Sequence, residues 1–306
     1  MSIDFIKEEI IVNRKLSYCI FRTEEAPQAV VFTVHGMQEH KERYEGFARY
    51  LNKNGIACVT YDLPGHGKDC SSDELGWFGE KDGWFNLVDS AVEIAKLCHE
   101  EFPGVPVICF GHSMGTMVAR TFLQDHEGLI DGMILSGAPN YLPASKIGVK
   151  VAAVVTKVKG KHGHSHLLDN MATGSFNKSV DHPRTSLDWL SFNTQNVDTY
   201  IADPLCGFPF TCQGYKDLFE GMGYMSDISR FHCKNGDLPI WMFAGEEDPC
   251  CGGKEGLEDS AQTLRKAGYH NVVTSMYPGM RHETLHEDKA ESVMKDVADW
   301  VLAHTK

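Results

Sequence analysis

The feature that most constrains this chain is a glycine-flanked serine that follows an apolar run. Residues 105–110 read Val-Pro-Val-Ile-Cys-Phe, and residues 111–115 read Gly-His-Ser-Met-Gly. A serine that attacks a carbonyl must stand on a tight turn at a strand end, and glycines on both sides let neighbouring backbone approach without a Cβ clash. The pattern predicts a nucleophile elbow, with Ser113 as nucleophile and Gly111 and Gly115 as elbow glycines. The alternative is an ordinary strand-to-helix turn.

The surrounding chain alternates between two hydrophobic patterns, which indicates the fold class. Short β-rich runs predict buried strands, and between them apolar residues recur at helical spacing. Such alternation predicts an α/β fold with a mainly parallel sheet covered by helices on both faces. The predicted strands are Ala29–His35, Ala57–Asp62, Val105–Phe110, Gly132–Ser136, Pro239–Gly245 and Val272–Tyr277, and the helical stretches are Lys41–Asn54, Trp84–Glu101, Met114–His126, Glu255–Gly268 and one from Glu291 onward.

A serine hydroxyl needs a base to accept its proton and an acid to orient that base. His282 follows the last predicted strand and is the predicted general base. Asp248 follows the preceding strand, with Glu246 and Glu247 as rivals beside it. Both positions lie at the carboxyl edge of the sheet, where sites form in α/β proteins, so we expect a triad of Ser113, His282 and Asp248.

The reaction also needs backbone N–H groups that stabilise the oxyanion formed by the attack. Met114 directly follows the nucleophile and is expected to provide one N–H group. Met37 follows the first predicted strand in the run His35-Gly36-Met37 and is expected to provide the other. Gly36 would permit the close approach that this arrangement requires.

Four segments together resemble the lysophospholipase and monoacylglycerol lipase group of α/β hydrolases, which is also catalogued with serine aminopeptidases. The resemblance extends over nearly the whole chain, and its most specific segments are 35–40, 61–67, 111–115 and 245–249, with 200–208 in addition. It implies an eight-stranded sheet, a lid between strands six and seven, no cofactor, and the triad roles given above for Asp248 and His282.

The function predicted on these grounds is hydrolysis of carboxylic esters with an apolar acyl chain, through an acyl-enzyme. The substrate would resemble a monoacylglycerol or lysophospholipid, or be a simpler ester of a general carboxylesterase. An aminopeptidase or amidase of the same fold is the alternative, and would need an acidic residue such as Asp188 or Asp203 to bind a free amino terminus. A non-catalytic binding protein is a further alternative.

The middle of the chain departs from the alternating pattern and predicts an inserted cap. We divide the chain into a first core part at 1–140, a cap at 141–236 and a second core part at 237–306. Ile147–Val158 is mostly apolar with interspersed lysines, which is consistent either with a lid helix over an acyl pocket or with ordinary packing on the core. Further apolar residues of unknown direction are Phe208, Phe210, Tyr215, Phe219, Met222 and Tyr224.

Three patterns suggest metal or redox chemistry, and we predict no metal site from any of them. His282-Glu283-Thr284-Leu285-His286 matches the zinc protease signature, but that signature needs a continuous helix and Pro278-Gly279 lies just upstream. Alternating histidines at 162, 164 and 166 are more typical of an exposed loop. The pair Cys250-Cys251 is interpreted as loop cysteines, with a redox switch or metal contact as the alternative.

The net charge and the cysteine content indicate which binding partners and which compartment to expect. The net charge is −13, from 42 acidic and 29 basic residues, and this opposes binding to nucleic acid. No basic, apolar leader is recognisable in residues 1–9, and no segment is long enough to span a bilayer. Scattered cysteines favour a reducing cytoplasm. We expect a small ester substrate and at most transient lipid contact through the cap; the oligomeric state stays open.

Overall fold

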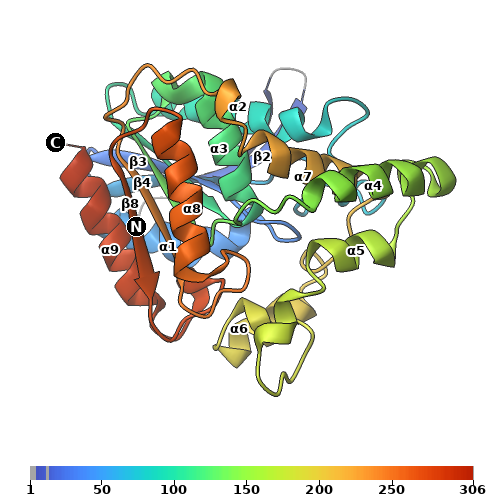
Figure 1. The fold of residues 1–306 in the computed structure, drawn as a ribbon. Coiled ribbons are helices and arrows are strands. Elements are labelled where there is room, and N and C mark those ends of the chain that lie inside the picture. Colours follow the sequence, from blue (N-terminus) through green and yellow to red (C-terminus); the bar gives the residue numbers. More distant parts are fainter. Residues whose placement is uncertain (1–4, 12–13, 306) are drawn as a thin grey trace.

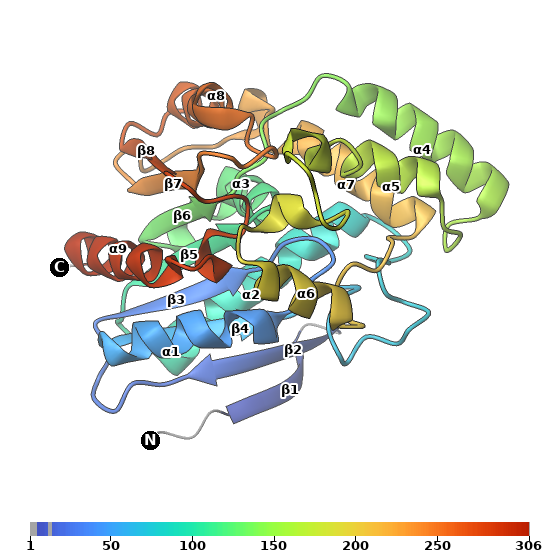
Figure 2. The same cartoon turned by 90° about the horizontal axis from the view of Figure 1, so that it is seen from below.

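A computed structural model of the protein describes residues 5–11 and 14–305, so part of the N-terminal segment assessed for a leader lies outside it. At its centre is an eight-stranded sheet in the order β1-β2-β4-β3-β5-β6-β7-β8 (Figures 1 and 2). β1 pairs antiparallel with β2, β2 pairs antiparallel with β4, and the other pairs are parallel. The strands are β1 Phe5–Ile11, β2 Arg14–Phe21, β3 Ala29–Val34, β4 Ile56–Tyr61, β5 Val107–His112, β6 Gly132–Ser136, β7 Ile240–Gly245 and β8 Val272–Tyr277.

All six strands expected from the apolar runs are present; β6 and β8 have the predicted bounds, and the ends of the other four are shifted. The largest shift is in β5, which begins at Val107 instead of Val105 and continues to His112, so it ends directly before Ser113. Every residue of β3, β4, β5, β6 and β7 is buried, as expected for parallel strands covered on both faces. The hydrophobic pattern did not indicate β1 and β2; only the family resemblance implied eight strands.

Helices cover both faces of the sheet. α1 and α9 pack on one face, and α2, α3 and α8 pack on the other. Figure 2 shows α1 and α9 lying along the sheet. The helices of this core are α1 Glu45–Lys53, α2 Gly83–Glu101, α3 Met114–His126, α8 Gly253–Lys266 and α9 Ala290–His304, with 3-10 turns η1 Lys41–Tyr44, η2 Glu127–Leu129 and η6 Thr284–His286.

Between β6 and β7 the chain forms a helical insertion on the carboxyl side of the sheet (Figure 1). α4, α5 and α7 contact one another, whereas α6 lies apart from them. The helices of the insertion are α4 Ser145–Lys159, α5 His166–Ala172, α6 Thr194–Ala202 and α7 Cys212–Tyr224, with 3-10 turns η3 Phe176–Ser179, η4 Asp188–Leu190 and η5 Ile228–Arg230. Its place between the sixth and seventh strands matches the expected lid.

The sheet brings the candidate site residues to one edge. β3 leads to Met37, β5 to Ser113, β7 to Asp248 and β8 to His282. Because β3, β5, β6, β7 and β8 run parallel, the loops that follow them meet at the carboxyl edge of the sheet. Within the described residues, no helix combines the length and the apolar character needed to cross a bilayer.

Candidate active site

Ser113 occupies the turn between β5 and α3 in a strained conformation. Its φ of 52° and ψ of −121° lie in a region that non-glycine residues rarely adopt. The turn is held by the Ser113 N–H, which donates to the Ser136 carbonyl at 3.0 Å, and by Thr116, whose N–H and hydroxyl donate to the Ser113 carbonyl at 2.9 and 2.7 Å. This strained backbone conformation is the one expected of the serine in a nucleophile elbow.

The two elbow glycines are required by backbone packing. A Cβ atom on Gly115 would lie 2.0 Å from the Val34 carbonyl oxygen, because α3 begins directly beside the end of β3. A Cβ atom on Gly111 would lie 2.8 Å from the Gly115 carbonyl oxygen. Neither position has room for a side chain, so the turn can form only with glycine at both positions.

His282 and Asp248 form a buried pair. The ring Nδ1 of His282 lies 3.0 Å from both carboxylate oxygens of Asp248, and each residue is 2% exposed. The Cys250 N–H donates to Asp248 Oδ1 at 2.8 Å and holds the carboxylate in place. The rivals Glu246 and Glu247 are exposed at the surface. Of the three neighbouring carboxylates, Asp248 is therefore the one positioned to orient the histidine.

Neighbouring groups determine both the position and the charge of the His282 ring. The Trp189 ring packs against it with centroids 4.9 Å apart, and Gly137 leaves room for it, since a Cβ there would lie 3.0 Å from His282 Cε1. Burial acts to lower the pKa of His282, but the charge and hydrogen bond of Asp248 outweigh burial and raise it above its usual value. Among the described residues, Nε2 of His282 is buried without a hydrogen-bond partner.

The loop after β3 is held close to the serine. The Gly36 N–H donates to Glu39 Oε1 at 2.5 Å, and a Cβ on Gly36 would lie 3.2 Å from the Ser113 Cβ. The carbonyl of Gln38 accepts hydrogen bonds from the Gly207 N–H at 3.0 Å and the Tyr200 hydroxyl at 2.8 Å. The insertion thus helps to hold the loop that carries Met37.

A buried charge network, not anticipated from the sequence, connects the two loops of the site. Arg43 binds both carboxylate oxygens of Glu283, at 2.6 and 2.8 Å, and also Glu39 at 2.7 Å. Asn196 of α6 donates to Glu283 at 2.6 Å. Burial acts to raise the pKa of Glu39, but the Arg43 charge lowers it to about 2. Glu283 lies in the His-Glu-x-x-His pattern and Glu39 lies in segment 35–40, but neither pattern indicated that the two carboxylates would share one arginine.

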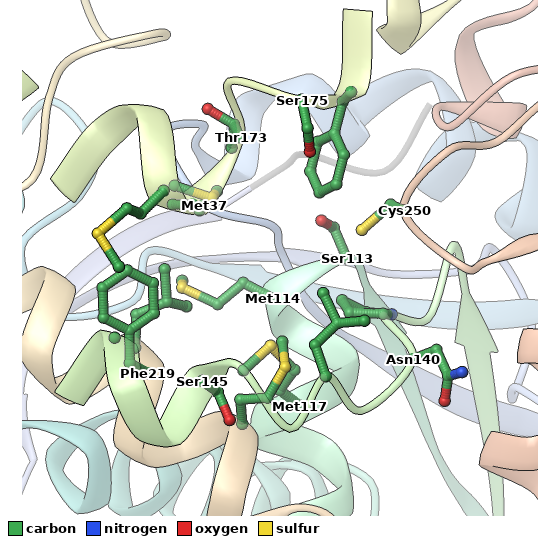
Figure 3. A pocket seen from close by; sticks show the side chains of 18 of the residues that line it. Met37, Ser113, Met114, Met117, Asn140, Ser145, Thr173, Ser175, Phe219 and Cys250 are labelled. Carbon is green, nitrogen blue, oxygen red and sulfur yellow. The ribbon is translucent and has the colours of Figure 1, made fainter. Parts of the chain in front are cut away.

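Ser113 lies between two cavities of different character. The larger, of about 500 Å³, is lined by Ser113, by core residues and by residues of α4, α5 and α7 (Figure 3). None of the described residues that line it is charged; its apolar members include Met37, Met114, Met117, Leu218, Phe219 and Met222. The smaller cavity, of about 30 Å³, is lined by Ser113, His282, Glu39, Tyr200 and Glu283, among others.

The apolar cap residues whose direction the sequence left open fall into two groups: some line the large cavity, and others pack against the core. Ser145 and Gly148 of α4 line the large cavity, whereas Ile147, Val154 and Val158 of the same helix are more than half exposed. Phe219 and Met222 line the cavity, and Phe210 and Tyr215 are buried in the core. Phe208 and Tyr224 are partly buried against that core. The predicted lid helix at 147–158 is thus part of α4. The first turns of α4 face the pocket, and the rest of the helix does not line it.

The patterns that suggested metal chemistry have other roles in the structure. His282 to His286 spans a loop and the short turn η6, so the two histidines do not share one α-helix face. His162 stacks on Trp77 with ring centroids 3.9 Å apart, and His164 Nδ1 lies 3.2 Å from the Phe210 carbonyl. Cys250 lines the large cavity, where Figure 3 shows it beside Ser113, and Cys251 is buried.

The acidic residues considered for a peptidase are engaged elsewhere. Asp188 accepts hydrogen bonds from the N–H groups of Arg184 and Thr185 and from the Thr185 hydroxyl. Asp203 binds His40 at 2.9 Å. Neither residue lines either of the two cavities at Ser113.

The eight-stranded sheet with its strand-order change, elbow and inserted helices defines an α/β-hydrolase. Residues 25–289 match the family model described as serine aminopeptidase, S33. The human monoglyceride lipase is 26% identical over 287 residues, covering 91% of this chain and 84% of the relative. The monoacylglycerol lipase of Mycolicibacterium smegmatis is 24% identical, covering 95% of this chain and 94% of the relative.

Solved structures agree with this assignment. A thermostable carboxyl esterase from Bacillus coagulans, in complex with glycerol, superposes over the full length of both chains with a TM-score of 0.90 and 25% identity. A soluble variant of monoglyceride lipase from Saccharomyces cerevisiae has the same fold, with a TM-score of 0.75 over 100% of this chain and 96% of that chain, at 20% identity. The chain belongs to the serine aminopeptidase S33 family and is a carboxylic ester hydrolase.

Proposed function

We propose that the protein hydrolyses monoacylglycerol-like esters with Ser113, His282 and Asp248 as its catalytic triad. The observation that carries the proposal is that Ser113 lines both an uncharged cavity of about 500 Å³ and a small polar one. An ester bound at Ser113 would place its apolar acyl chain in the large cavity, where burial is favourable. Its polar alcohol would lie on the polar side of Ser113, toward Glu39 and Tyr200. The monoacylglycerol lipases among the relatives support this substrate class.

The proposed reaction follows from the hydrogen bonds of His282. With Nδ1–H donated to Asp248, the lone pair on Nε2 is free to accept the Ser113 proton. Ser113 Oγ then attacks the ester carbonyl, while the N–H groups of Met37 and Met114 stabilise the oxyanion. The alcohol leaves with the proton from His282. Water then attacks the acyl-enzyme with the same base, and the carboxylic acid is released.

The cavity favours an ester over a peptide with a free amino terminus. An aminopeptidase would need a carboxylate to pair with the substrate ammonium group, because an unpaired buried charge is costly. The large cavity has no charged residue in its described lining, and Asp188 and Asp203 are bonded outside it. We therefore place aminopeptidase activity second, although the matching family model is described as serine aminopeptidase.

The proposal is tested by labelling and turnover. The wild type and Ser113→Ala are treated with a fluorophosphonate probe and assayed with p-nitrophenyl esters of increasing chain length, with 1-monoacylglycerols and with an aminoacyl p-nitroanilide. We expect labelling to require Ser113 and turnover to favour longer acyl chains and monoacylglycerols. Ser71→Ala, at an exposed serine outside both cavities, is the control and should label normally. Full activity in Ser113→Ala, or faster cleavage of the anilide, would refute the proposal.

We also propose that the protein is cytoplasmic and that its insertion makes brief contact with lipid surfaces. The nine cysteines from Cys58 to Cys251 are free thiols, which fits a reducing compartment such as the cytoplasm. The outer surface of α4 and α5 presents apolar side chains beside lysines, a combination suited to brief contact with a lipid surface. The exposed apolar residues there that do not line the large cavity are Ile147, Val154, Val158 and Leu167, and the exposed lysines are Lys146, Lys150, Lys157 and Lys159.

A further inference from the structure

A second group of polar side chains lies outside the proposed triad, where the loop after β3 meets the loop after α6. It contains His40 from the first loop and Asp203 and Cys206 from the second. One potential ligand atom from each, a ring nitrogen, a carboxylate oxygen and a sulfur, lies within 4.8 Å of the other two. In a tetrahedral zinc site the ligand atoms are about 3.5 Å apart, so only small side-chain shifts would bring these three together.

The imidazole of His40 is already oriented for such a site. Its Nε2 lies 2.9 Å from Asp203 Oδ2, and its Nδ1 lies 2.7 Å from Glu42 Oε2. A carboxylate that accepts the second ring N–H is the arrangement found behind most metal-binding histidines, where it fixes the tautomer and turns the other nitrogen toward the metal. Glu42 provides this carboxylate, and Lys41 lies 3.0 Å from its other oxygen.

The backbone around the cluster is also fixed. The Leu205 N–H donates to Asp203 Oδ1 at 2.8 Å, and the Cys206 N–H donates to the Asp203 carbonyl at 3.0 Å. The next residue, Gly207, donates to Gln38 in the loop after β3. These bonds hold the Asp-x-x-Cys turn opposite His40 with no ion required, so a cation would find its ligands nearly in place.

From this geometry we propose that His40, Asp203 and Cys206 bind a zinc ion, with water as the fourth ligand. The mixed nitrogen, oxygen and sulfur set suits Zn²⁺, whereas Mg²⁺ and Ca²⁺ prefer oxygen ligands alone. Asp203 is partly exposed, with 29% of its side chain accessible, and provides the route by which the ion enters. This site is separate from the proposed triad, and the inference does not depend on the proposed function.

The ion would replace protons that the cluster now holds. In the metal-free cluster the His40 ring lies between two carboxylates, with Nδ1 beside Glu42 and Nε2 beside Asp203. Zinc takes the place of the Nε2 proton and of the Cys206 thiol proton, and both are released to solvent.

Binding would join the insertion to the loop expected to form the oxyanion hole. His40 lies three residues after Met37, and Asp203 and Cys206 follow α6. The Gln38 carbonyl already accepts bonds from Tyr200 and Gly207 across the same boundary. Zinc would therefore act as a structural crosslink that restrains α6 and the Met37 loop together.

The test uses the full chain, stripped with a chelator, desalted and titrated with Co²⁺ in place of zinc. We expect one equivalent to bind with a sulfur-to-cobalt charge-transfer absorption in the near ultraviolet, and Zn²⁺ to remove this absorption by displacement. Cys206→Ser should lose the absorption. Glu42→Gln should keep it but bind Co²⁺ about 10- to 100-fold more weakly, as expected when a second-shell carboxylate loses its charge.

Two further variants keep the test decisive. Asp248, Cys250 and His282 form the other three-residue group of possible ligands among the described residues, so Cys250→Ser must retain the absorption. If Cys206→Ser does not fold, as judged by circular dichroism, Asp203→Asn replaces it and should bind at least 10-fold more weakly with the sulfur absorption intact. No absorption in the wild type, its persistence in folded Cys206→Ser, its loss in Cys250→Ser, or unchanged affinity in Asp203→Asn would each overturn the proposal.

Discussion

At the scale of single residues, burial distinguishes carboxylates that are adjacent in sequence. Glu246, Glu247 and Asp248 occupy one loop, yet the first two are exposed and Asp248 is buried against His282. The same contrast applies to the histidines. Burial and the nearby His282 lower the pKa of His112 to about 4, so it is neutral at physiological pH, whereas Asp248 raises the pKa of His282. His282 is thus the histidine of this pair that stays protonated to a higher pH than an ordinary histidine.

The first prediction concerns the pH dependence of activity. A general base must be neutral, and a raised pKa keeps His282 protonated to higher pH, so kcat/KM should fall on acidification through a pH above about 6.5, the ordinary histidine value. Asp248→Asn should shift this acidic fall in kcat/KM to lower pH. It should also reduce kcat about 10⁴-fold, because the His282 ring loses the carboxylate that orients it. The control Glu247→Gln should change neither. The assignment is wrong if Asp248→Asn and Glu247→Gln have the same pH profile as the wild type.

At the scale of elements, the site depends on how two loops from distant parts of the chain are joined. Arg43 in η1 pairs with Glu39 behind the Met37 loop and with Glu283 directly after His282. Asn196 adds a bond from α6 to the same carboxylate. One guanidinium therefore aligns the proposed oxyanion loop, the proposed base and the insertion. It is a positioning residue, because it acts through its neighbours.

The second prediction is that Arg43→Met destabilises the protein more than loss of a surface pair does. It leaves the buried Glu39 and Glu283 without their cation, which should cost about 3–5 kcal/mol in the free energy of unfolding. Arg49→Met removes an exposed pair with Glu45 and should cost less than about 1 kcal/mol. Urea unfolding of both variants measures the difference. Equal losses would show that the network adds no more than a surface ion pair.

At the scale of the whole molecule, the insertion lines the larger cavity and also presents a surface of its own. α4 turns Ser145 and Gly148 toward the cavity and leaves Val154 and Val158 exposed, at 63% and 80%. Figure 2 shows α4 and α5 projecting from the core at the end of the molecule away from β1. A lid with an apolar outer surface would allow an ester to pass from a lipid phase into the cavity with little exposure to water.

The third prediction separates this surface from the catalytic chemistry. Val154→Glu combined with Val158→Glu should lower the rate on a long-chain monoacylglycerol in anionic phospholipid vesicles about tenfold, because apolar contact is lost and charge of the wrong sign is added. The rate on a dissolved short-chain p-nitrophenyl ester should not change. Val273→Glu, on the edge strand β8 and 48% exposed, is the matched control. Equal rates on vesicles for all three proteins would exclude a role of α4 in lipid contact.

The features that could be predicted from the sequence alone are those that depend on residues close together in the chain. The strand-to-helix turn at Ser113 with its glycines, the six parallel strands, and the places of Asp248 and His282 after their strands could be predicted, because each depends on neighbouring residues or on a repeating pattern. β1 was not indicated because charged residues interrupt its apolar pattern, and the cap helices α5 and α6 were not indicated because they are too short for their patterns to repeat over several turns.

Tertiary structure decided which distant groups meet. Arg43 and Glu283 are 240 positions apart, and His40 and Asp203 are 163 apart, so no local pattern could pair them. Burial, which depends on the whole packed chain, selects Asp248 from its neighbours and separates the pocket-lining residues of α4 from its exposed ones. The sequence by itself determined the fold class and the positions from which the site residues project. Folding determined their distances, their charges and the two cavities that meet at Ser113.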